Sequence, residues 1–300
     1  MKKVSLFFGV ALVCIQMSAQ ILPAGFFMSD VSIGASWNAP VGAAFTVDGQ
    51  RLFVWEKDGR VYTCTREANG NYKKQPQPVL DISDEVGSWI DHGLMGFALD
   101  PQFENNGYVY ALYVVDRHHL LTNGLASNGY NRDTNQYFNA TIGRVTRYTT
   151  TTSGGNLVAI LSSRKILIGE SKSTGLPMLY QSHGTGSLVF ASDGTLLVSC
   201  GDGASFNAED SGSIDDTYYK QALIDGIIRP EENVGAFRSQ MLNSHNGKLL
   251  RINPENGNGI SSNPFFDASA PRSPKSRVWA LGFRNPFRFS IKPGTGSTDS

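Results

Sequence analysis

The segment SHGTGSLVFASDGTLLVSCGDGASF, residues 182–206, contains a strand–turn–strand pattern that recurs along the chain. An apolar run that includes Phe190 is followed three residues later by the turn dipeptide Asp-Gly, and a second apolar run follows the turn. The pattern recurs in GAAFTVDGQRLFV with Phe45 and in MGFALDPQFENNGYVYALYV with Phe97, and it begins again in FRFSIKPGTG with Phe289. Short strands joined by tight turns at repeated intervals predict an all-β fold of the β-propeller type.

A closing strand is shared by three copies of the repeat: GRVYTCT from Gly59, GRVTRYT from Gly143 and GKLLRIN from Gly247. The fourth copy reaches Ser300 before its second strand. We therefore expect residues 21–300 to be the N-terminal portion of a longer propeller domain, incomplete at its C-terminus, with about the first four blades present.

Two polar segments interrupt the repeat, Arg117–Ala140 and Gly203–Ser244, and neither shows strand alternation. We expect both to form loops over one end of the propeller, because loops of this kind carry function on a rigid scaffold. The second segment is expected to contain a short helix near Tyr218–Ile227.

The charge balance restricts the kinds of partner. The chain has 26 basic and 26 acidic side chains among 300 residues, so its formal net charge is zero. A surface field that attracts nucleic acid or an anionic membrane is therefore not expected, and a small or neutral partner is favoured. No segment is long and apolar enough to span a bilayer.

The first 20 residues are typical of a secretory signal peptide. Lys2 and Lys3 precede an apolar run from Val4 to Ile15, and small residues follow near Ala19. We expect the mature chain, residues 21–300, to be exported. It then keeps only Cys64 and Cys200, as either a disulfide or two buried thiols.

The same opening stretch places a histidine and an aspartate where they can meet. If Asp193-Gly194 form a two-residue hairpin loop, the register places Thr185 opposite Asp202. His183 then lies on the same face as Asp202, as a diagonal neighbour with Cα atoms about 7–8 Å apart. In one interpretation, Asp202 fixes the tautomer of His183 and leaves its other ring nitrogen as a general base. In the other, the two residues are a structural pair at a strand end.

The motifs HGTGSLVFASDGTLLVSCGDGA, NGKLLRINPENG and VWALGFRNPFRFSI, together with GLMGFALDPQFENNGYVY, resemble the soluble glucose/sorbosone dehydrogenase family. Those proteins are six-bladed propellers that oxidise sugars with pyrroloquinoline quinone (PQQ). The resemblance implies that His183 takes the proton of the sugar's C1 hydroxyl while hydride passes to the quinone, and that Asp202 orients His183. It also implies that Arg284 and Asn285 contact the quinone's carbonyl oxygens. A guanidinium there would stabilise negative charge that develops in the transition state.

Two positions depart from the family pattern. Asp91 and His92 precede GLMGF where the family usually has Gln or Glu, and the shorter Asp91 side chain reaches less far toward a cofactor. Asn207 takes the position of another polar cofactor contact, in a segment where the correspondence with the family loosens. Asp91 and Asn207 are therefore candidate cofactor-binding residues by resemblance alone.

The resemblance also implies a calcium ion and basic residues that pair with the quinone's carboxylates, all expected beyond residue 300. No metal ligand is therefore predicted in this chain, and these 300 residues alone are not expected to bind the quinone. The acidic stretch DGASFNAEDSGSIDD does not follow EF-hand spacing and is predicted to be a solvated loop, with a calcium site as the less favoured alternative.

The leading hypothesis is an exported PQQ-dependent sugar or aldose dehydrogenase with an unidentified electron acceptor. The alternative is a catalytically inactive extracellular propeller that acts as a carbohydrate-binding or adhesion module, which the departure at Asp91-His92 and the long second insertion favour. A third hypothesis, a calcium-dependent hydrolase of the lactonase type, would need carboxylates and asparagines around the central channel, and this portion of sequence does not contain such a cluster.

Overall fold

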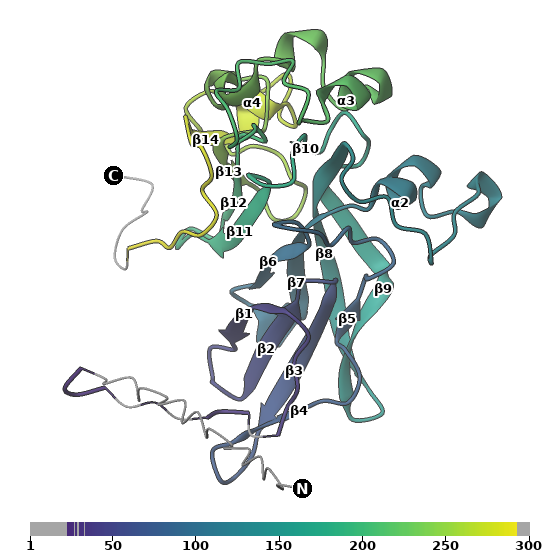
Figure 1. Ribbon diagram of the computed structural model, residues 1–300. Coiled ribbons are helices and arrows are strands. Elements are labelled where there is room, and N and C mark those ends of the chain that lie inside the picture. The colour runs from purple at the N-terminus through teal and green to yellow at the C-terminus, as the bar shows by residue number, and fades with distance from the viewer. Residues whose placement is uncertain (1–22, 27, 29, 33, 293–300) are drawn as a thin grey trace, which may run out of the picture.

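The computed structural model describes residues 23–26, 28, 30–32 and 34–292, and the predicted signal peptide of residues 1–20 lies outside this part of the chain. Three antiparallel sheets dominate the described residues, which confirms the predicted all-β class. Figure 1 shows the sheets beside one another, with β1–β5 at the bottom and β11–β14 toward the top. Within the same residues, no helix has both the length and the apolar character needed to cross a membrane.

The three sheets follow one another along the chain. The first has the order β1-β2-β3-β4 with β5 paired to β3, the second β10-β8-β7-β6 with β9 paired to β8, and the third β11-β12-β13-β14. The predicted closing strands are β3, β8 and β13, each the third of its sheet. The bounds are β1 Pro40–Phe45, β2 Arg51–Glu56, β3 Arg60–Arg66, β4 Tyr72–Lys74, β5 Leu80–Asp81, β6 Leu94–Leu99, β7 Tyr108–Val114, β8 Thr141–Ser153, β9 Asn156–Ile168, β10 Leu176–Met178, β11 Thr185–Phe190, β12 Leu196–Cys200, β13 Lys248–Ile252 and β14 Val278–Leu281.

The aspartate of the repeat makes the same turn in all three sheets. The side chains of Asp48, Asp100 and Asp193 each accept a hydrogen bond from the backbone N–H two residues later, at 2.9, 2.9 and 3.0 Å. This is an Asx turn, in which the side chain replaces a backbone group and bends the chain. Gly49 and Gly194 follow with φ of +64° and +79°, a left-handed conformation that a glycine adopts without strain. The motif is therefore a turn signal at the end of each inner strand.

Aromatic side chains fill the interfaces between the sheets. Phe53 of β2 stacks on Phe97 of β6 with ring centroids 5.8 Å apart, and Phe103 meets Phe53 edge-on at 5.5 Å. Tyr110 of β7 meets Phe190 of β11 edge-on at 5.1 Å. The inner strands β1, β6 and β11 contact one another in that order. Each sheet thus packs face to face with the next, as blades do.

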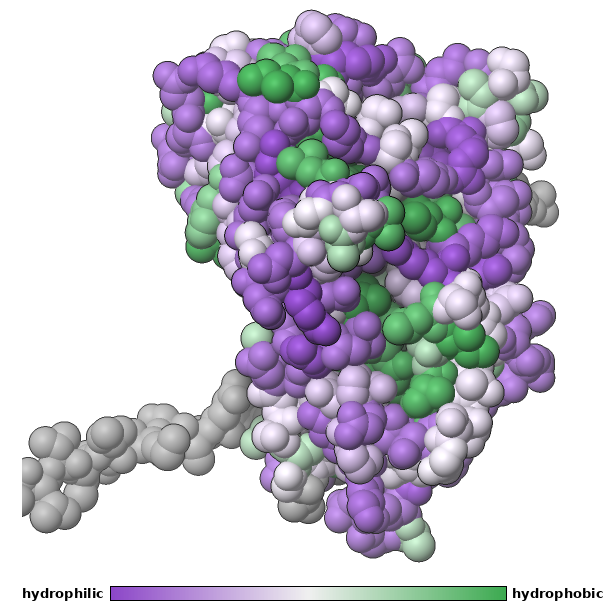
Figure 2. Space-filling model, turned by 90° about the vertical axis from the view of Figure 1, so that its right-hand side faces the viewer, coloured by the Kyte–Doolittle hydropathy of each residue, from purple (hydrophilic) through white to green (hydrophobic). Residues whose placement is uncertain are grey.

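The polar insertions lie at one end of the sheets, as predicted, with α3 above β10 and α2 to the right of the upper end of β8 in Figure 1. Helix α3 agrees with the helix expected near Tyr218–Ile227. Figure 2 shows that the upper part of the right-hand side of Figure 1 is mostly hydrophilic, so the insertions present polar residues to solvent there. The helical bounds are α1 Phe103–Asn106, α2 Arg117–Thr122, η1 Ala126–Asn128, α3 Tyr219–Asp225, η2 Pro230–Glu232, η3 Gly235–Gln240 and α4 Pro274–Arg277.

The fourth copy of the repeat does not form a blade in the described residues. Residues 282–292 contain no strand and run instead beside β11. There the carbonyl of Phe287 accepts a hydrogen bond from the hydroxyl of Ser187 at 3.1 Å, and Arg288 donates to the carbonyl of Gly186 at 3.3 Å. The described residues therefore form three complete sheets, and the part of the fourth copy that they include adds no strand.

Cys64 and Cys200, the two cysteines among the described residues, are free and buried. Cys64 lies in β3 of the first sheet and Cys200 in β12 of the third, so two separate sheets hold them. Of the two alternatives left by the sequence, the structure has the buried thiols.

Candidate functional site

His183 and Asp202 face each other at the end of the third sheet that carries the insertions. His183 lies two residues before β11 and Asp202 two residues after β12. The Nδ1 atom of His183 is 3.1 Å from Oδ1 of Asp202, and the two side chains are 11% and 1% exposed. The predicted contact between them is therefore present.

The register that predicted this contact was wrong. The hairpin loop has three residues, because Ala191 N–H donates to the carbonyl of Thr195 at 2.9 Å. A bulge between Thr185 and Leu188 then shifts the pairing by one more residue, so Thr185 lies opposite Cys200. A shift of one residue moves a side chain to the other face of a sheet, and a second shift returns it. Continuing the observed register places His183 directly opposite Asp202 instead of diagonally.

The backbone holds His183 in a left-handed conformation with φ of +55°. A non-glycine residue adopts it only where surrounding contacts require it. The His183 carbonyl accepts from the N–H of Gly203 at 3.0 Å, and the neighbouring Gly184 carbonyl accepts from the N–H of Gly201 at 2.8 Å. A Cβ atom on Gly201 would lie 2.4 Å from the His183 carbonyl oxygen, so only glycine fits there. The position of the imidazole is thus fixed from the opposite strand.

Asp202 stays ionised although it is buried. Burial alone would raise the pKa of its carboxyl, but hydrogen bonds from His183, from the Ala204 N–H at 2.9 Å and from Arg284 at 2.7 Å outweigh that effect. The pKa of Asp202 is therefore below its ordinary value of 3.8. Hydrogen bonds to the charged form of an acid lower its pKa in this way.

The contact with an ionised carboxylate defines the tautomer of His183. A carboxylate only accepts hydrogen bonds, so the bonded Nδ1 atom must carry the proton. In the neutral ring Nε2 then has the lone pair and accepts a proton. No hydrogen bond to Nε2 joins it to another residue in the described part of the chain. The pair has the arrangement of a general base and the acid that orients it.

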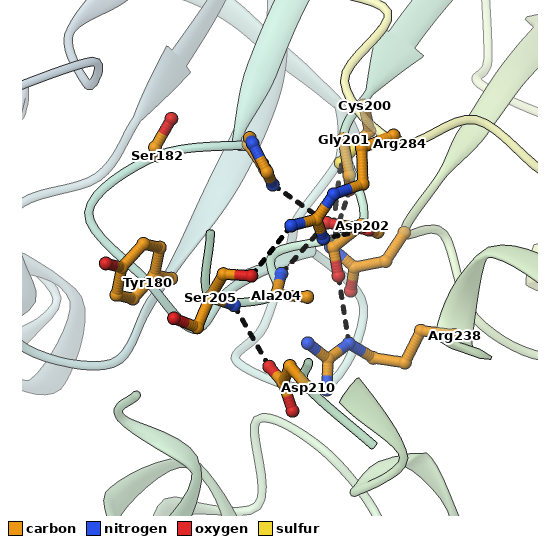
Figure 3. Close-up of polar contacts among 12 residues, drawn as sticks. Tyr180, Ser182, Cys200, Gly201, Asp202, Ala204, Ser205, Asp210, Arg238 and Arg284 are labelled. Atoms are coloured by element: carbon orange, nitrogen blue, oxygen red, sulfur yellow. Dashed lines mark hydrogen bonds and ion pairs between the residues drawn. The ribbon is translucent and has the colours of Figure 1, made fainter. Parts of the chain in front are cut away.

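Two arginines reach Asp202 from opposite sides (Figure 3). Arg284, whose side chain is 47% exposed, donates through Nη1 to the Asp202 carboxylate and through Nη2 to the Ser205 carbonyl, both at 2.7 Å. The Asp202 N–H also donates to the Arg284 carbonyl at 2.9 Å, so residues 201–202 and 284 run side by side. Arg238, which is 2% exposed, donates through Nε to the Asp202 carbonyl at 3.0 Å. The next residue after Arg284, Asn285, is exposed.

Lys248 supports this cluster from within the fold. Its ammonium group is fully buried and donates to the carbonyls of Arg238, Ser239 and Asn246, at 3.0, 2.9 and 2.7 Å. Burial lowers the pKa of Lys248 to about 8. Sequence reasoning missed Lys248 and Arg238. Lys248 could have been found from the sequence, because a lysine at a position of a closing strand that should be buried indicates a special role. Arg238 lies in a long insertion without a repeating pattern, so the sequence gives no signal for it.

The remaining candidates surround the pair without contacting it in the same way. Asp91 accepts a hydrogen bond from the hydroxyl of Ser182, the residue before His183. Asn207 donates through Nδ2 to the hydroxyl of Tyr180 at 2.7 Å and to Asp216 at 3.1 Å. Both therefore lie at the same end of the fold as His183 and Asp202.

The acidic loop after Asp202 bonds to its own groups. Asp210 accepts from the N–H groups of Ser205 and Gly212 at 3.0 and 2.9 Å, and Asp215 pairs with Lys220 at 2.8 Å. Among the described residues, no group of three or more His, Cys, Asp or Glu side chains could hold a metal ion.

Comparison with known proteins gives the family. Residues 37–298 match the Glucose / Sorbosone dehydrogenase family, and the chain belongs to it. A solved structure of the PQQ-bound form of aldose sugar dehydrogenase from Streptomyces coelicolor aligns with a TM-score of 0.52 and 21% identity, over 86% of this chain and 54% of that one. Its fold confirms the β-propeller prediction.

Two curated relatives match at somewhat higher identity. The HIPL2 protein of Arabidopsis thaliana is 25% identical over 289 residues, which is 90% of this chain and 38% of the relative. Hedgehog-interacting protein of Homo sapiens is 31% identical over 177 residues, which is 55% of this chain and 21% of the relative. The chain thus spans well under half of these curated relatives.

Proposed function

We propose that the protein is an exported PQQ-dependent sugar or aldose dehydrogenase in which His183 removes the proton of the C1 hydroxyl. One observation carries the proposal: the hydrogen bond of 3.1 Å between Nδ1 of His183 and the buried Asp202 carboxylate. It leaves Nε2 free to accept a proton, and the ionised Asp202 stabilises the imidazolium that forms. A base positioned in this way contributes roughly 10²–10⁴-fold to a rate.

Arg284 and Asn285 are proposed to hold the quinone. The chemistry of this donor set fits, because a half-exposed guanidinium and an exposed amide beside the base suit electron-rich carbonyl oxygens. When bound, the quinone supplies the acceptor for the hydride. Arg284 keeps Asp202 neutralised on one side and presents its exposed edge to solvent. Asp91 and Asn207 are proposed as further polar contacts to the cofactor.

Calcium is proposed as a second cofactor on the basis of the family resemblance, with its ligands expected beyond residue 300. Export is proposed from the signal-peptide pattern of residues 1–20. The substrate class, a small neutral sugar, agrees with the zero formal net charge of the chain.

The test uses the full-length protein titrated with PQQ and calcium, with aldoses as substrates and an artificial electron acceptor. We expect turnover in the wild type and its loss in His183→Gln at unchanged melting temperature. Wild-type protein that oxidises no sugar, or a His183→Gln variant that retains full turnover, would contradict the proposal.

A second function is favoured by one observation, the match to Hedgehog-interacting protein, whose name describes binding to another protein rather than oxidation. In that case the propeller would be a catalytically inactive extracellular module for binding carbohydrate or for adhesion. The same titration discriminates between the two, because a module of this kind binds its ligand equally well after His183→Gln and reduces no acceptor.

A further inference from the structure

Phe206 places an exposed aromatic ring beside the proposed base. The side chain is 53% exposed, and its ring centroid lies 6.1 Å from that of His183 at an interplanar angle of 57°. On its other side the ring meets Tyr180 edge-on at 5.2 Å. The base therefore has an apolar surface as its immediate neighbour.

The backbone on both sides of Phe206 is held in place. Ser205 is fully buried, its N–H donates to Asp210 at 3.0 Å, and its hydroxyl donates to Asp216 at 2.8 Å. After Phe206, the Asn207 N–H donates to the Ser205 hydroxyl at 3.0 Å. The segment is thus rigid, and its one large apolar side chain still faces solvent. A phenylalanine left half in water forgoes much of the stabilisation that full burial of its ring would provide.

We propose that Phe206 is a specificity-determining residue, on which the C–H face of an aldopyranose packs while its hydroxyl reaches Nε2 of His183. This inference rests on the proposed dehydrogenase function and names a residue that selects its substrate. A pyranose ring has patches of C–H groups between its hydroxyls, and an aromatic face attracts them because its π-system is electron-rich. Ligand sites commonly combine such an apolar wall with a few polar groups that fix orientation. Open-chain polyols lack a matching flat C–H face.

The chain contains a matched control in Phe45. It is also 53% exposed and also meets a tyrosine edge-on, Tyr72 at 5.4 Å. Phe45 ends inner strand β1, however, whereas His183 precedes inner strand β11, so the two rings lie at opposite ends of equivalent strands. Phe45→Ala removes the same area of exposed aromatic surface without changing the site.

The experiment compares wild type, Phe206→Ala, Phe206→Trp and Phe45→Ala in the full-length protein. Binding of D-glucose is followed by saturation-transfer NMR without quinone or electron acceptor, so that no turnover occurs. Steady-state kinetics with PQQ and calcium are measured separately. We expect Phe206→Ala to lose the saturation-transfer signal and to raise KM about 10-fold, with kcat and its pH profile retained. Phe206→Trp should restore both values, and Phe45→Ala should behave as wild type.

The two measurements separate this inference from the proposed function. If wild type reduces no acceptor, the dehydrogenase proposal fails, and the NMR signal alone decides the role of Phe206. A signal that Phe206→Ala loses and Phe45→Ala keeps supports the role. Equal signals in these two variants, no signal in wild type, or equal KM values in active enzymes would overturn it.

Discussion

The dipeptide His-Gly occurs two residues before the inner strand in two neighbouring blades, and its two histidines have different environments. His92 precedes β6, is fully buried, and pairs through Nε2 with the Tyr180 carbonyl at 2.7 Å. His183 precedes β11, lies at the rim, and pairs through Nδ1 with a carboxylate. The comparison shows that the partner and the burial, rather than the local sequence, decide what a histidine can do.

The largest expected effect separates the two histidines by rate. His183→Gln should lower kcat by roughly 10²–10⁴-fold, because glutamine cannot accept the proton, and should leave the melting temperature nearly unchanged. His92→Gln should lower the melting temperature and leave kcat per folded molecule within a few-fold of wild type. The comparison fails if His92→Gln proves the more damaging to kcat.

A smaller loss of rate is expected from Gly201→Ala. Its Cβ atom would lie 2.4 Å from the His183 carbonyl oxygen, so the imidazole must move. Misplacing a catalytic group by about 1 Å costs about 10²-fold in rate. The control is Gly194→Ala in the hairpin turn, which strains a residue with φ of +79° and should lower stability alone. Equal kcat in the two folded variants would show that Gly201 does not position His183.

Stability between pH 6.5 and 4 should depend on His92. Burial lowers the pKa of His92 from 6.5 to about 4, so the unfolded chain binds a proton in this interval that the folded chain does not. Wild type should therefore lose stability as pH falls, by up to about 3 kcal/mol from this group. His92→Gln should remove that part of the slope. Urea unfolding at several pH values measures it, and parallel curves for the two proteins would contradict the assignment.

The smallest effect is expected at lower pH and belongs to Asp202. Its folded pKa lies below the ordinary 3.8, so the ionised carboxylate stabilises the fold above that pH, and the contribution disappears as pH falls through the folded pKa. Asp202→Asn should be less stable than wild type at neutral pH and should approach it in acid. A constant difference between the two proteins across this range would rule out a lowered pKa.

The repeat predicted the fold because each copy contains its own turn chemistry. Asp48, Asp100 and Asp193 act through bonds to residues two positions away, which a sequence displays directly. The contact between His183 and Asp202 was predicted from a loop of the wrong length. The longer loop and the bulge each shift the register by one residue, and their sum restores the face. The bulge lies where residues 286–288 run beside Gly186 and Ser187, a contact between distant segments that the local pattern does not reveal.

The support of the site could not be predicted for the same reason. Arg238 donates to the Asp202 carbonyl, and Lys248 donates in turn to the Arg238 carbonyl, so Lys248 reaches the site only through Arg238. Both roles depend on burial that only the folded chain defines. The ion pair between Arg284 and Asp202 joins residues 82 positions apart. The family resemblance assigned Arg284 to the quinone, and the structure adds its bond to Asp202, the residue proposed to orient His183.

The pairing of His183 with Asp202 is tested most sharply by the tautomer of His183 in the full-length protein, read by long-range ¹H–¹⁵N NMR with ¹⁵N-labelled histidine. The chain has five histidines, and His183→Gln assigns the signal. We expect a proton on Nδ1 and an unprotonated Nε2 in neutral His183, with this preference weakened in Asp202→Asn. A proton on Nε2 in the wild type would contradict it.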